Sequence, residues 1–303
     1  MLKKTILLEN KASVTTKYLQ LVIKSEIRES TIPIEDIGFL VIDHPEIYLS
    51  IPAMNLLIEY NSAVILCGTN HLPNGMFLNL NSHHIQQEIF KNQINASVPL
   101  KKQLWQQTII EKITNQGILL EKITGTKNSF DFLCSKVLSG DTSNMEGVAA
   151  SQYWKAFFDP KNIELTNQLK FKRERFGDYP NNFLNYGYAI LRAATARALS
   201  GSGLLNTLGI HHKSKYNAFA LADDIMEPYR PIVDEKVFNL MQNHEEQELN
   251  TFLKSELLQI LTQTVYFKEE KSPLMVALQK TASSLQQCYT GDRKKIKYPK
   301  LWT

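Results

Sequence analysis

Imidazole and carboxylate side chains that could bind a metal lie close together in one stretch of the chain. His211 and His212 precede the sequence DDIME, in which Asp224 and Glu227 are three residues apart. Residues three apart on a helix share a face, and two carboxylates at that distance repel unless a cation or proton lies between them. Together with Glu146 upstream, this mixture of hard oxygen donors and imidazoles is typical of Mg²⁺ or Mn²⁺ sites that act on phosphates.

A proline follows the second of these carboxylates directly. Because Pro228 disfavours the α conformation for the residue before it, we predict that a helix over 216–227 ends at Glu227. A carboxylate at the end of a helix can be directed into a cleft, where it could act as a ligand.

Simpler interpretations of the same residues are open. Most histidines bind no metal, so the pair at 211 and 212 also fits an ordinary core or surface position. Ser143 and Glu146 fit the S-x-x-E capping box, in which the glutamate only bonds back to the start of its helix. On spacing alone, the metal site is one hypothesis among several.

Length and composition indicate a globular protein with a substantial core. The chain has 303 residues with 43% hydrophobic content, enough for one large domain or two ordinary ones. Its three cysteines, Cys67, Cys134 and Cys288, form no C-x-x-C pair, which argues against a disulfide framework or a structural zinc site. No stretch approaches twenty apolar residues. We therefore expect a soluble protein of the reducing cytoplasm that does not contact a membrane.

The positive charge of the chain is unevenly distributed. Residues 1–90 hold six Lys or Arg and nine Asp or Glu, which gives a net charge of −3. Because the whole chain has a net charge of +4, residues 91–303 carry +7. An excess of Lys and Arg beside the candidate site favours contact with a polyanion such as DNA, although a solvated helical face could carry the same excess.

The spacing of apolar residues divides the chain into two parts. Short strand-like segments are predicted over 5–8, 19–23, 39–42, 63–67 and 76–80, with a helix that follows an N-cap at Ser50. Helical spacing is found over 85–93, 101–123, 127–138, 143–158, 181–200, 216–227, 232–246, 248–267 and 272–288. The predicted class is α+β: a small N-terminal mainly β domain over 1–82, a linker over 83–100 and a larger all-α catalytic domain over 101–303.

Four blocks of sequence, in order along the chain, resemble the CRISPR-associated integrase, the endonuclease of spacer acquisition in antiviral defence. They are LKKQLWQQ with KITNQ at 100–116, NMEGVAA at 144–150, NNFLNYGY at 181–188, and the segment from LGIHH at 208 through EPYRP at 231. The resemblance covers most of the chain. It is closest to the branch of type II systems, which work beside an RNA-guided effector nuclease.

The resemblance implies a ligand set for Mg²⁺ or Mn²⁺. It assigns the metal to Glu146, His212 and Glu227, with Asp224 as an auxiliary carboxylate nearby. Relatives usually carry an apolar residue where this chain has His211, so His211 is a second candidate near the metal.

The resemblance also implies a reaction and partners. The 3′ hydroxyl of a short captured DNA would attack a phosphodiester at the edge of a repeat, an exchange that needs no nucleotide-binding loop, and none is found in the sequence. The implied partners are double-stranded DNA, as captured fragment and CRISPR repeat array; a second copy of the chain, joined through the N-terminal domains; and a small CRISPR-associated protein that bridges two dimers. A type II system would add the effector nuclease and an accessory DNA-clamping protein. A non-catalytic DNA-capture subunit and a stand-alone structure-selective DNA nuclease are the alternatives.

Basic residues interleaved with Phe171 and Phe176 form the densest candidate DNA contact, although a solvated loop is the alternative interpretation. The candidate DNA-binding residues are Lys170, Lys172, Arg173, Arg175 and Arg230. The five basic residues between Arg293 and Lys300 are predicted to form a disordered arm. Tyr186 and Tyr188 lie in an apolar helix and are predicted to pack in the core.

Overall fold

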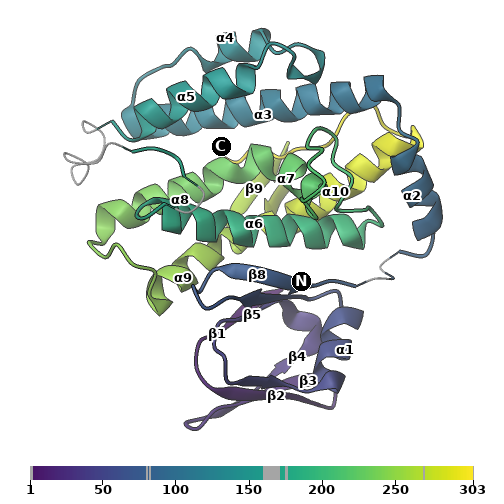
Figure 1. Ribbon diagram of the computed structural model, residues 1–303, viewed down its shortest axis with the longest axis vertical. Coiled ribbons are helices and arrows are strands. Elements are labelled where there is room, and N and C mark those ends of the chain that lie inside the picture. The colour runs from purple at the N-terminus through teal and green to yellow at the C-terminus, as the bar shows by residue number, and fades with distance from the viewer. Residues whose placement is uncertain are drawn as a thin grey trace.

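The computed structural model describes residues 3–79, 81, 83–159, 171–174, 177–268 and 270–302. An N-terminal part rich in strands is followed by a larger helical part (Figure 1), so the predicted α+β class is confirmed. The strands are β1 (Lys4–Leu8), β2 (Ala12–Lys17), β3 (Gln20–Lys24), β4 (Glu29–Pro33), β5 (Ile37–Ile42), β6 (Ile47–Leu49), β7 (Ala63–Cys67), β8 (Pro73–Phe77), β9 (Thr264–Phe267) and β10 (Glu270–Pro273). The helices are α1 (Ile51–Glu59), α2 (Gln86–Ile94), α3 (Val98–Thr124), α4 (Phe130–Ser135), α5 (Met145–Phe157), α6 (Asn181–Gly201), α7 (Ala220–Met226), α8 (Arg230–Asn243), α9 (Thr251–Leu258) and α10 (Leu274–Thr290). Single-turn 3₁₀ helices are η1 (Ile34–Asp36), η2 (Ser139–Asp141), η4 (Glu227–Tyr229) and η5 (Gln259–Thr262).

Two four-stranded sheets make up the N-terminal part. The first has the strand order β1-β5-β7-β8, and the second has the order β4-β3-β2-β6. Strands β1, β5 and β7 are parallel, with α1 in the crossover between β5 and β7. The Ser50 hydroxyl accepts a hydrogen bond from the backbone of Ala53, so the predicted N-cap of α1 is confirmed.

The first sheet is buried on both faces, which explains the continuous apolar sequence of its central strands. Phe39 and Val41 pack into the core of the helical part, whereas Leu40 packs into the core between the two sheets. Alternate residues of one strand therefore join the two parts of the chain.

Three strands of the second sheet, β2, β4 and β6, were not predicted from the sequence. The strand predicted over 76–80 is found as β8, but it covers Pro73–Phe77, so the turn predicted at Pro73 to Gly75 is wrong. Since β8 lies at the edge of its sheet, the missing N–H of a proline is tolerated there.

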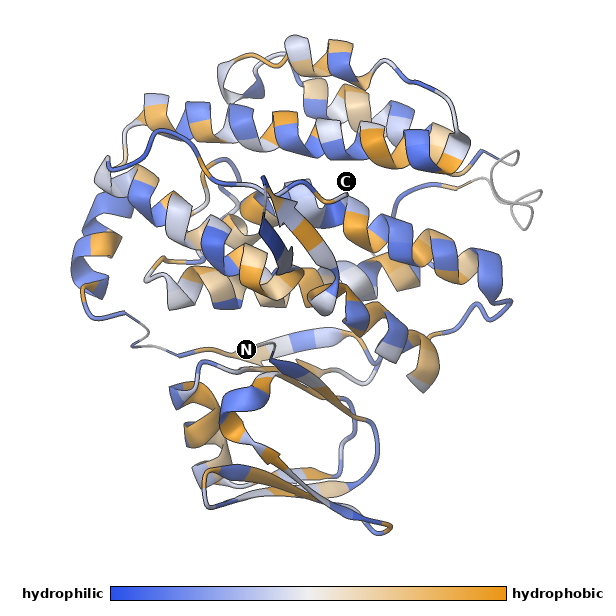
Figure 2. Cartoon of the chain, turned by 180° about the vertical axis from the view of Figure 1, so that it is seen from behind, coloured by the Kyte–Doolittle hydropathy of each residue, from blue (hydrophilic) through white to orange (hydrophobic). Residues whose placement is uncertain are grey.

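In the helical part, α6 is the central element. It contacts α7, α8, α9, α10 and the first sheet, and α3 lies on the far side of this layer with α4 and α5 (Figure 1). Hydrophilic and hydrophobic residues alternate along α3 (Figure 2), as expected for a helix with one buried side. Much of the predicted linker over 83–100 is helical, because α2 and the first turn of α3 lie within it.

Close packing of α3 against α4 explains why α3 has a glycine at position 117. A Cβ atom at this position would lie 2.8 Å from Cβ of Phe130, at the start of α4. The glycine thus serves the contact between α3 and α4 instead of breaking the helix.

The predicted helix over 248–267 is wrong in its second half. Helix α9 ends at Leu258, and β9 then pairs antiparallel with β10. Tyr266 also exchanges two backbone hydrogen bonds of 2.8 Å with Lys300. The helical part is therefore not all-α, because the β-branched and aromatic sequence of β9 meets strand partners there.

The prediction of a disordered arm over Arg293 to Lys300 is also wrong. The backbone of Ile296 pairs with the side chain of Gln107 on α3 through bonds of 2.6 and 2.9 Å. The hydroxyl of Tyr298 lies 2.9 Å from that of Thr108, one residue further along α3. The segment is thus held against α3.

A buried ion cluster joins α9 to the first sheet. Nζ of Lys254 lies 2.6 Å from Oδ2 of Asp43 and 3.0 Å from Oε1 of Glu9. The other oxygen of Asp43 lies 2.8 Å from Nδ1 of His71.

Within the described residues, no helix is long and apolar enough to span a membrane.

We predict that Lys254→Met lowers the free energy of unfolding by roughly 3 to 5 kcal/mol, because it leaves the buried Asp43 carboxylate without its main counter-charge. Urea denaturation measures the change. Lys280→Met is the matched control, since its partner Glu270 is exposed and such a pair contributes less than about 1 kcal/mol. Equal losses in the two variants would contradict the importance of the buried cluster.

Candidate functional site

One lysine side chain contacts two of the predicted ligands, Glu146 and Glu227, which lie far apart in the sequence. Nζ of Lys112, in the middle of α3, lies 2.7 Å from Oε1 of Glu146 and 2.6 Å from Oε2 of Glu227. Lys112 and Glu227 are buried, whereas the Glu146 side chain is 28% exposed. The candidate residues from α5 and from η4 therefore meet at α3. Lys112 was not predicted as a site residue, although it begins the KITNQ block.

The start of α5 is capped by a different residue from the one predicted. Both oxygens of Asp141 accept backbone hydrogen bonds, from Met145 at 2.9 Å and from Glu146 at 3.0 Å. The Ser143 hydroxyl instead donates to the carbonyl of Lys136. The capping-box interpretation is wrong, and the Glu146 carboxylate is left to face Lys112.

The chain does not leave the helical conformation at Glu227. Helix α7 ends at Met226 as the proline suggested, but Glu227 has φ −51° and ψ −47° and begins η4, which leads into α8. The expected effect of Pro228 on its neighbour is therefore wrong. The side chain of Asn115 donates to the carbonyl of Pro228 at 2.8 Å, so α3 also stabilises this junction.

Asp224 organises the two histidines. Its buried carboxylate accepts the backbone N–H of His211 at 2.9 Å and that of His212 at 3.3 Å, and it contacts Nδ1 of His212. The bond from Nδ1 raises the pKa of His212. With Nδ1 bound to Asp224, Nε2 is the nitrogen of His212 that could bind a metal.

The ring of His211 packs differently. It stacks on Trp105 of α3 with ring centroids 4.3 Å apart and an angle of 3° between the planes. This contact, together with its backbone bond to Asp224, gives His211 a role in holding the loop. The choice of His212 as the ligand stays a prediction.

Two cations keep Glu227 ionised. Burial alone would raise its pKa, but the charges of Arg230 and Lys112 lower the pKa to about 2. Arg230 donates to Oε1 of Glu227 at 2.8 Å. Oε2 is buried and makes no hydrogen bond of good geometry, so only the charge of Lys112 lies beside it.

The donor types suit Mg²⁺ or Mn²⁺, but an ammonium group lies among them. Two carboxylates and one imidazole nitrogen form a hard ligand set that leaves room for substrate oxygens. In the described parts of the chain, however, no three His, Cys, Asp or Glu residues are arranged to hold a metal. Nζ of Lys112 instead contacts both glutamates, at 2.7 Å from Glu146 and 2.6 Å from Glu227.

The predicted DNA-binding residues differ in where they lie. Lys170 and Arg175, with Phe176, lie outside the described residues. Lys172 is at the surface, 3.1 Å from Glu174.

Arg173 turns inward and donates to Asn181 and Asn185 of α6. Phe171 stacks on Phe158 with ring centroids 3.8 Å apart and packs against the core, so the ring of Phe171 is engaged within the protein.

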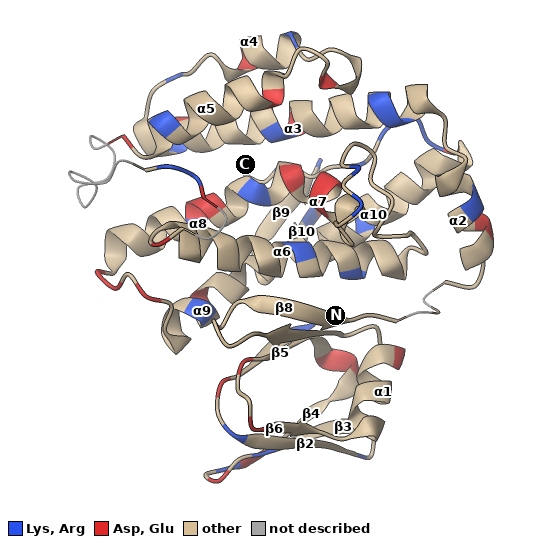
Figure 3. Ribbon diagram, in the orientation of Figure 1, with Lys and Arg blue, Asp and Glu red and all other residues tan. Residues whose placement is uncertain are grey.

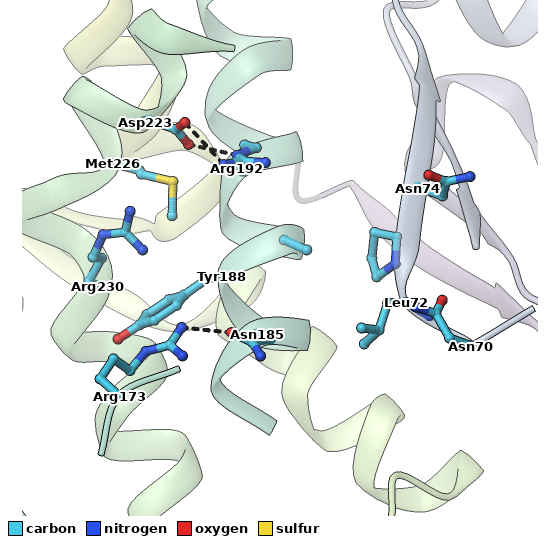
Figure 4. Close-up of a pocket in the computed structure, with 12 residues that line it drawn as sticks. Asn70, Leu72, Asn74, Arg173, Asn185, Tyr188, Arg192, Asp223, Met226 and Arg230 are labelled. Carbon is cyan, nitrogen blue, oxygen red and sulfur yellow. Dashed lines mark hydrogen bonds and ion pairs between the residues drawn. The ribbon is translucent and has the colours of Figure 1, made fainter. Parts of the chain in front are cut away.

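Two cavities meet at a pair of arginines. Arg173 and Arg230 lie over the ring of Tyr188, 5.3 and 4.6 Å from its centre, and face Asn70 and Asn74 across a cavity of about 450 Å³ (Figure 4). A second cavity of about 190 Å³ is lined by the same three residues and by Lys112, Glu227 and Asp234, among others. Charged residues of both signs gather around the ends of α7 and α8 there (Figure 3).

Tyr188 has more contacts than core packing requires. Tyr186 is fully buried, as predicted, and Tyr188 is 8% exposed. The hydroxyl of Tyr188 donates to Asp234, as does that of Tyr153 at 2.8 Å. Burial raises the pKa of Asp234 to about 6, the tyrosine hydroxyls acting in the opposite direction.

Comparison with known proteins decides the family. The family model described as CRISPR associated protein Cas1 matches residues 5–268. The chain belongs to this Cas1 family. It is 34% identical over 303 residues to the CRISPR-associated endonuclease Cas1 of Neisseria meningitidis serogroup C (strain 8013), covering 98% of this chain and 96% of the relative.

Solved structures of low sequence identity share the Cas1 fold. A casposase bound to its integration product superposes with a TM-score of 0.81 at 20% identity, over 97% of this chain and 92% of the casposase. A chain of a Cas6-RT-Cas1–Cas2 complex gives a TM-score of 0.74 at 19% identity, over 99% of this chain and 36% of its own length. The family recognised from the four sequence blocks is confirmed, and the type II branch stays a prediction.

We predict that Asp141→Ala lowers the free energy of unfolding by roughly 1 kcal/mol, because two N–H groups at the start of α5 lose their acceptor. Thermal or urea denaturation measures the loss. Ser143→Ala is the control and should change stability by less than about 0.5 kcal/mol. A larger cost for Ser143→Ala than for Asp141→Ala would restore the capping-box interpretation.

We predict that ionisation of Asp234 makes the stability of the parent protein depend on pH, and that Asp234→Asn lacks this contribution. The pKa of Asp234 rises from 3.8 to about 6 on folding. Between these values the folded state holds a proton that the unfolded state has lost, so stability falls as pH rises from about 4 to about 6 and is level above. As the pH rises through this window, the free energy of unfolding of Asp234→Asn should therefore increase relative to that of the parent by up to roughly 3 kcal/mol. Parallel unfolding curves of both proteins at each pH provide the measurement, and a constant difference would contradict the assignment.

Proposed function

We propose that this chain is a divalent-metal-dependent DNA integrase and endonuclease of CRISPR adaptation. In this reaction the 3′ hydroxyl ends of short captured DNA are joined to repeat ends by phosphodiester transesterification. The observation that carries the proposal is the convergence of Glu146 and Glu227 on one cation beside the loop of His212. The relative from Neisseria is named an endonuclease, and the casposase was captured with an integration product.

Glu146, Glu227 and Nε2 of His212 would hold Mg²⁺ or Mn²⁺, which would stabilise negative charge on the phosphodiester and assist ionisation of the attacking hydroxyl. The protein's own residues prepare this ligand set. Asp224 orients the imidazole, and Arg230 keeps Glu227 ionised. Asp141 takes over the capping of α5, so that Glu146 is free to act as a ligand.

Double-stranded DNA is the proposed substrate. Lys172 is the surface cation of the basic segment, and Arg173 and Arg230 line the cavities next to the site. Lys170 and Arg175 stay candidates from the sequence. Exchange of one phosphodiester for another needs no external energy, which agrees with a chain that has no nucleotide-binding loop.

The proposed assembly has several partners. Exposed apolar side chains support a homodimer joined through the N-terminal part: Tyr48 on the edge strand β6, and Tyr18 and Ile27 in the connections between the other strands of the second sheet. The similar chain in a Cas6-RT-Cas1–Cas2 complex supports a small CRISPR-associated protein that bridges two dimers. For the proposed type II branch, the effector nuclease and an accessory DNA-clamping protein join them in the cytoplasm.

We predict that Glu146→Ala and Glu227→Ala each reduce strand transfer by roughly a hundredfold or more, because either change removes a charged ligand from the site. Transfer of a labelled DNA into a repeat-bearing plasmid, with the partner protein and Mn²⁺ or Mg²⁺, is the measurement. Glu88→Ala, at an exposed position of α2, is the control and should keep the parent rate.

The same assay separates the alternatives. Parent-like transfer by Glu146→Ala would contradict the site assignment. Cleavage of branched DNA without joining would favour the stand-alone nuclease. Tight DNA binding with neither activity under any metal would favour the capture subunit.

A further inference from the structure

Lys112 has an unusual position for a lysine. It lies in the middle of the longest helix, its side chain is only 10% exposed, and both of its charged partners are candidate metal ligands. A buried ammonium is stabilised only where opposite charges compensate for its lost hydration. Here Glu146 and Glu227 provide that compensation, so the ammonium and the two carboxylates form one ionic cluster.

The two cations beside Glu227 are held in different ways. Arg230 donates to Oε1 with good hydrogen-bond geometry from three residues away. Lys112 lies 2.6 Å from Oε2, which makes no hydrogen bond of good geometry, and it donates to Glu146. Lys112 therefore contacts the oxygens that a shared cation would use, whereas Arg230 contacts a different oxygen and can stay in place.

The side chain of Lys112 also has space to move. It lines the cavity of about 190 Å³ together with Gln116, Ala150 and Trp154. A lysine side chain has a flexible four-carbon stem and a compact charge, so it can change rotamer without moving α3.

We propose that Lys112 is a built-in counterion of the site, a role that rests on the metal-dependent function proposed above. Its ammonium holds the Glu146 and Glu227 carboxylates close together before a divalent cation binds. When the cation binds, the ammonium moves into the adjoining cavity. Lys112 is thus a positioning residue that prepares the ligands and at the same time weakens metal binding.

Binding of Mn²⁺ alone, without DNA, tests the proposal by calorimetry. We expect Lys112→Met to bind Mn²⁺ roughly tenfold more tightly than the parent, because no ammonium has to be displaced. Its melting temperature should be lower without metal and should rise more than that of the parent when Mn²⁺ is added.

Lys122→Met is the matched control. Lys122 lies on the same helix and pairs with the mostly buried Glu235, but it does not contact the candidate ligands. Its loss should leave the affinity for Mn²⁺ at the parent value. Glu146→Gln should weaken Mn²⁺ binding in the parent background.

A second measurement uses the unchanged protein and so does not depend on how a variant folds. Acylation of lysines, followed residue by residue with mass spectrometry, should modify Lys112 several times faster when Mn²⁺ is present than when it is absent. Lys122 should react at the same rate in both conditions.

The outcomes separate this proposal from the function on which it rests. Equal affinity of the parent and Lys112→Met, with weaker binding by Glu146→Gln and no change in the acylation of Lys112, would overturn the counterion role alone. Absence of Mn²⁺ binding in every protein would overturn both proposals.

Discussion

Two neighbouring carboxylates repel each other unless a cation lies between them, and this constraint governs how three elements of the helical part meet. Glu146 comes from α5 and Glu227 from η4, and both face Lys112 of α3. Helix α3 is also the element that contacts η4 through Asn115 and the C-terminal segment through Gln107. One helix therefore contacts both carboxylates and also the junction that carries Glu227.

The ion cluster of Lys254 solves a similar problem between the helical part and the first sheet. In both places a lysine on a helix pairs with two acidic side chains of other elements. The first sheet is also buried on both faces, one in the core of the helical part and the other in the core between the two sheets. The site thus lies in a rigid scaffold, as a ligand set for a small cation requires.

The proposed role of Lys112 connects folding with function. The same charges that would bind a divalent cation need a substitute partner while the chain folds and before the metal binds. A lysine meets both needs, because its single charge binds two carboxylates less strongly than a divalent cation does and its stem is flexible. Arg230 could not replace it, since a planar guanidinium with a bidentate preference is harder to displace.

Much of the fold could be predicted from the sequence, because local patterns report local structure. The 3.6-residue spacing of α6 and α10, the Ser50 cap and the apolar runs of β5 and β7 all correspond to elements that are observed. Some of the wrong predictions concern segments that have partners distant in sequence. Strand β9 pairs with Lys300 as well as with the neighbouring β10, and the basic C-terminal segment is bound by Gln107 of α3. Neither of these distant contacts could be recognised from the residues of the segment itself.

The candidate site divides in the same way. The residue types of the site could be recognised from the sequence: Glu146, His212, Asp224 and Glu227 lie within blocks typical of the family. The contacts of these residues follow from the packing of the helices. Asp141 replaced Ser143 as the cap, Asp224 became the acceptor for the histidine loop, and Lys112 came between the two glutamates. The reason is physical, because the charge state and partner of a buried side chain depend on which helices pack around it, and the spacing of residues along one helix does not contain that information.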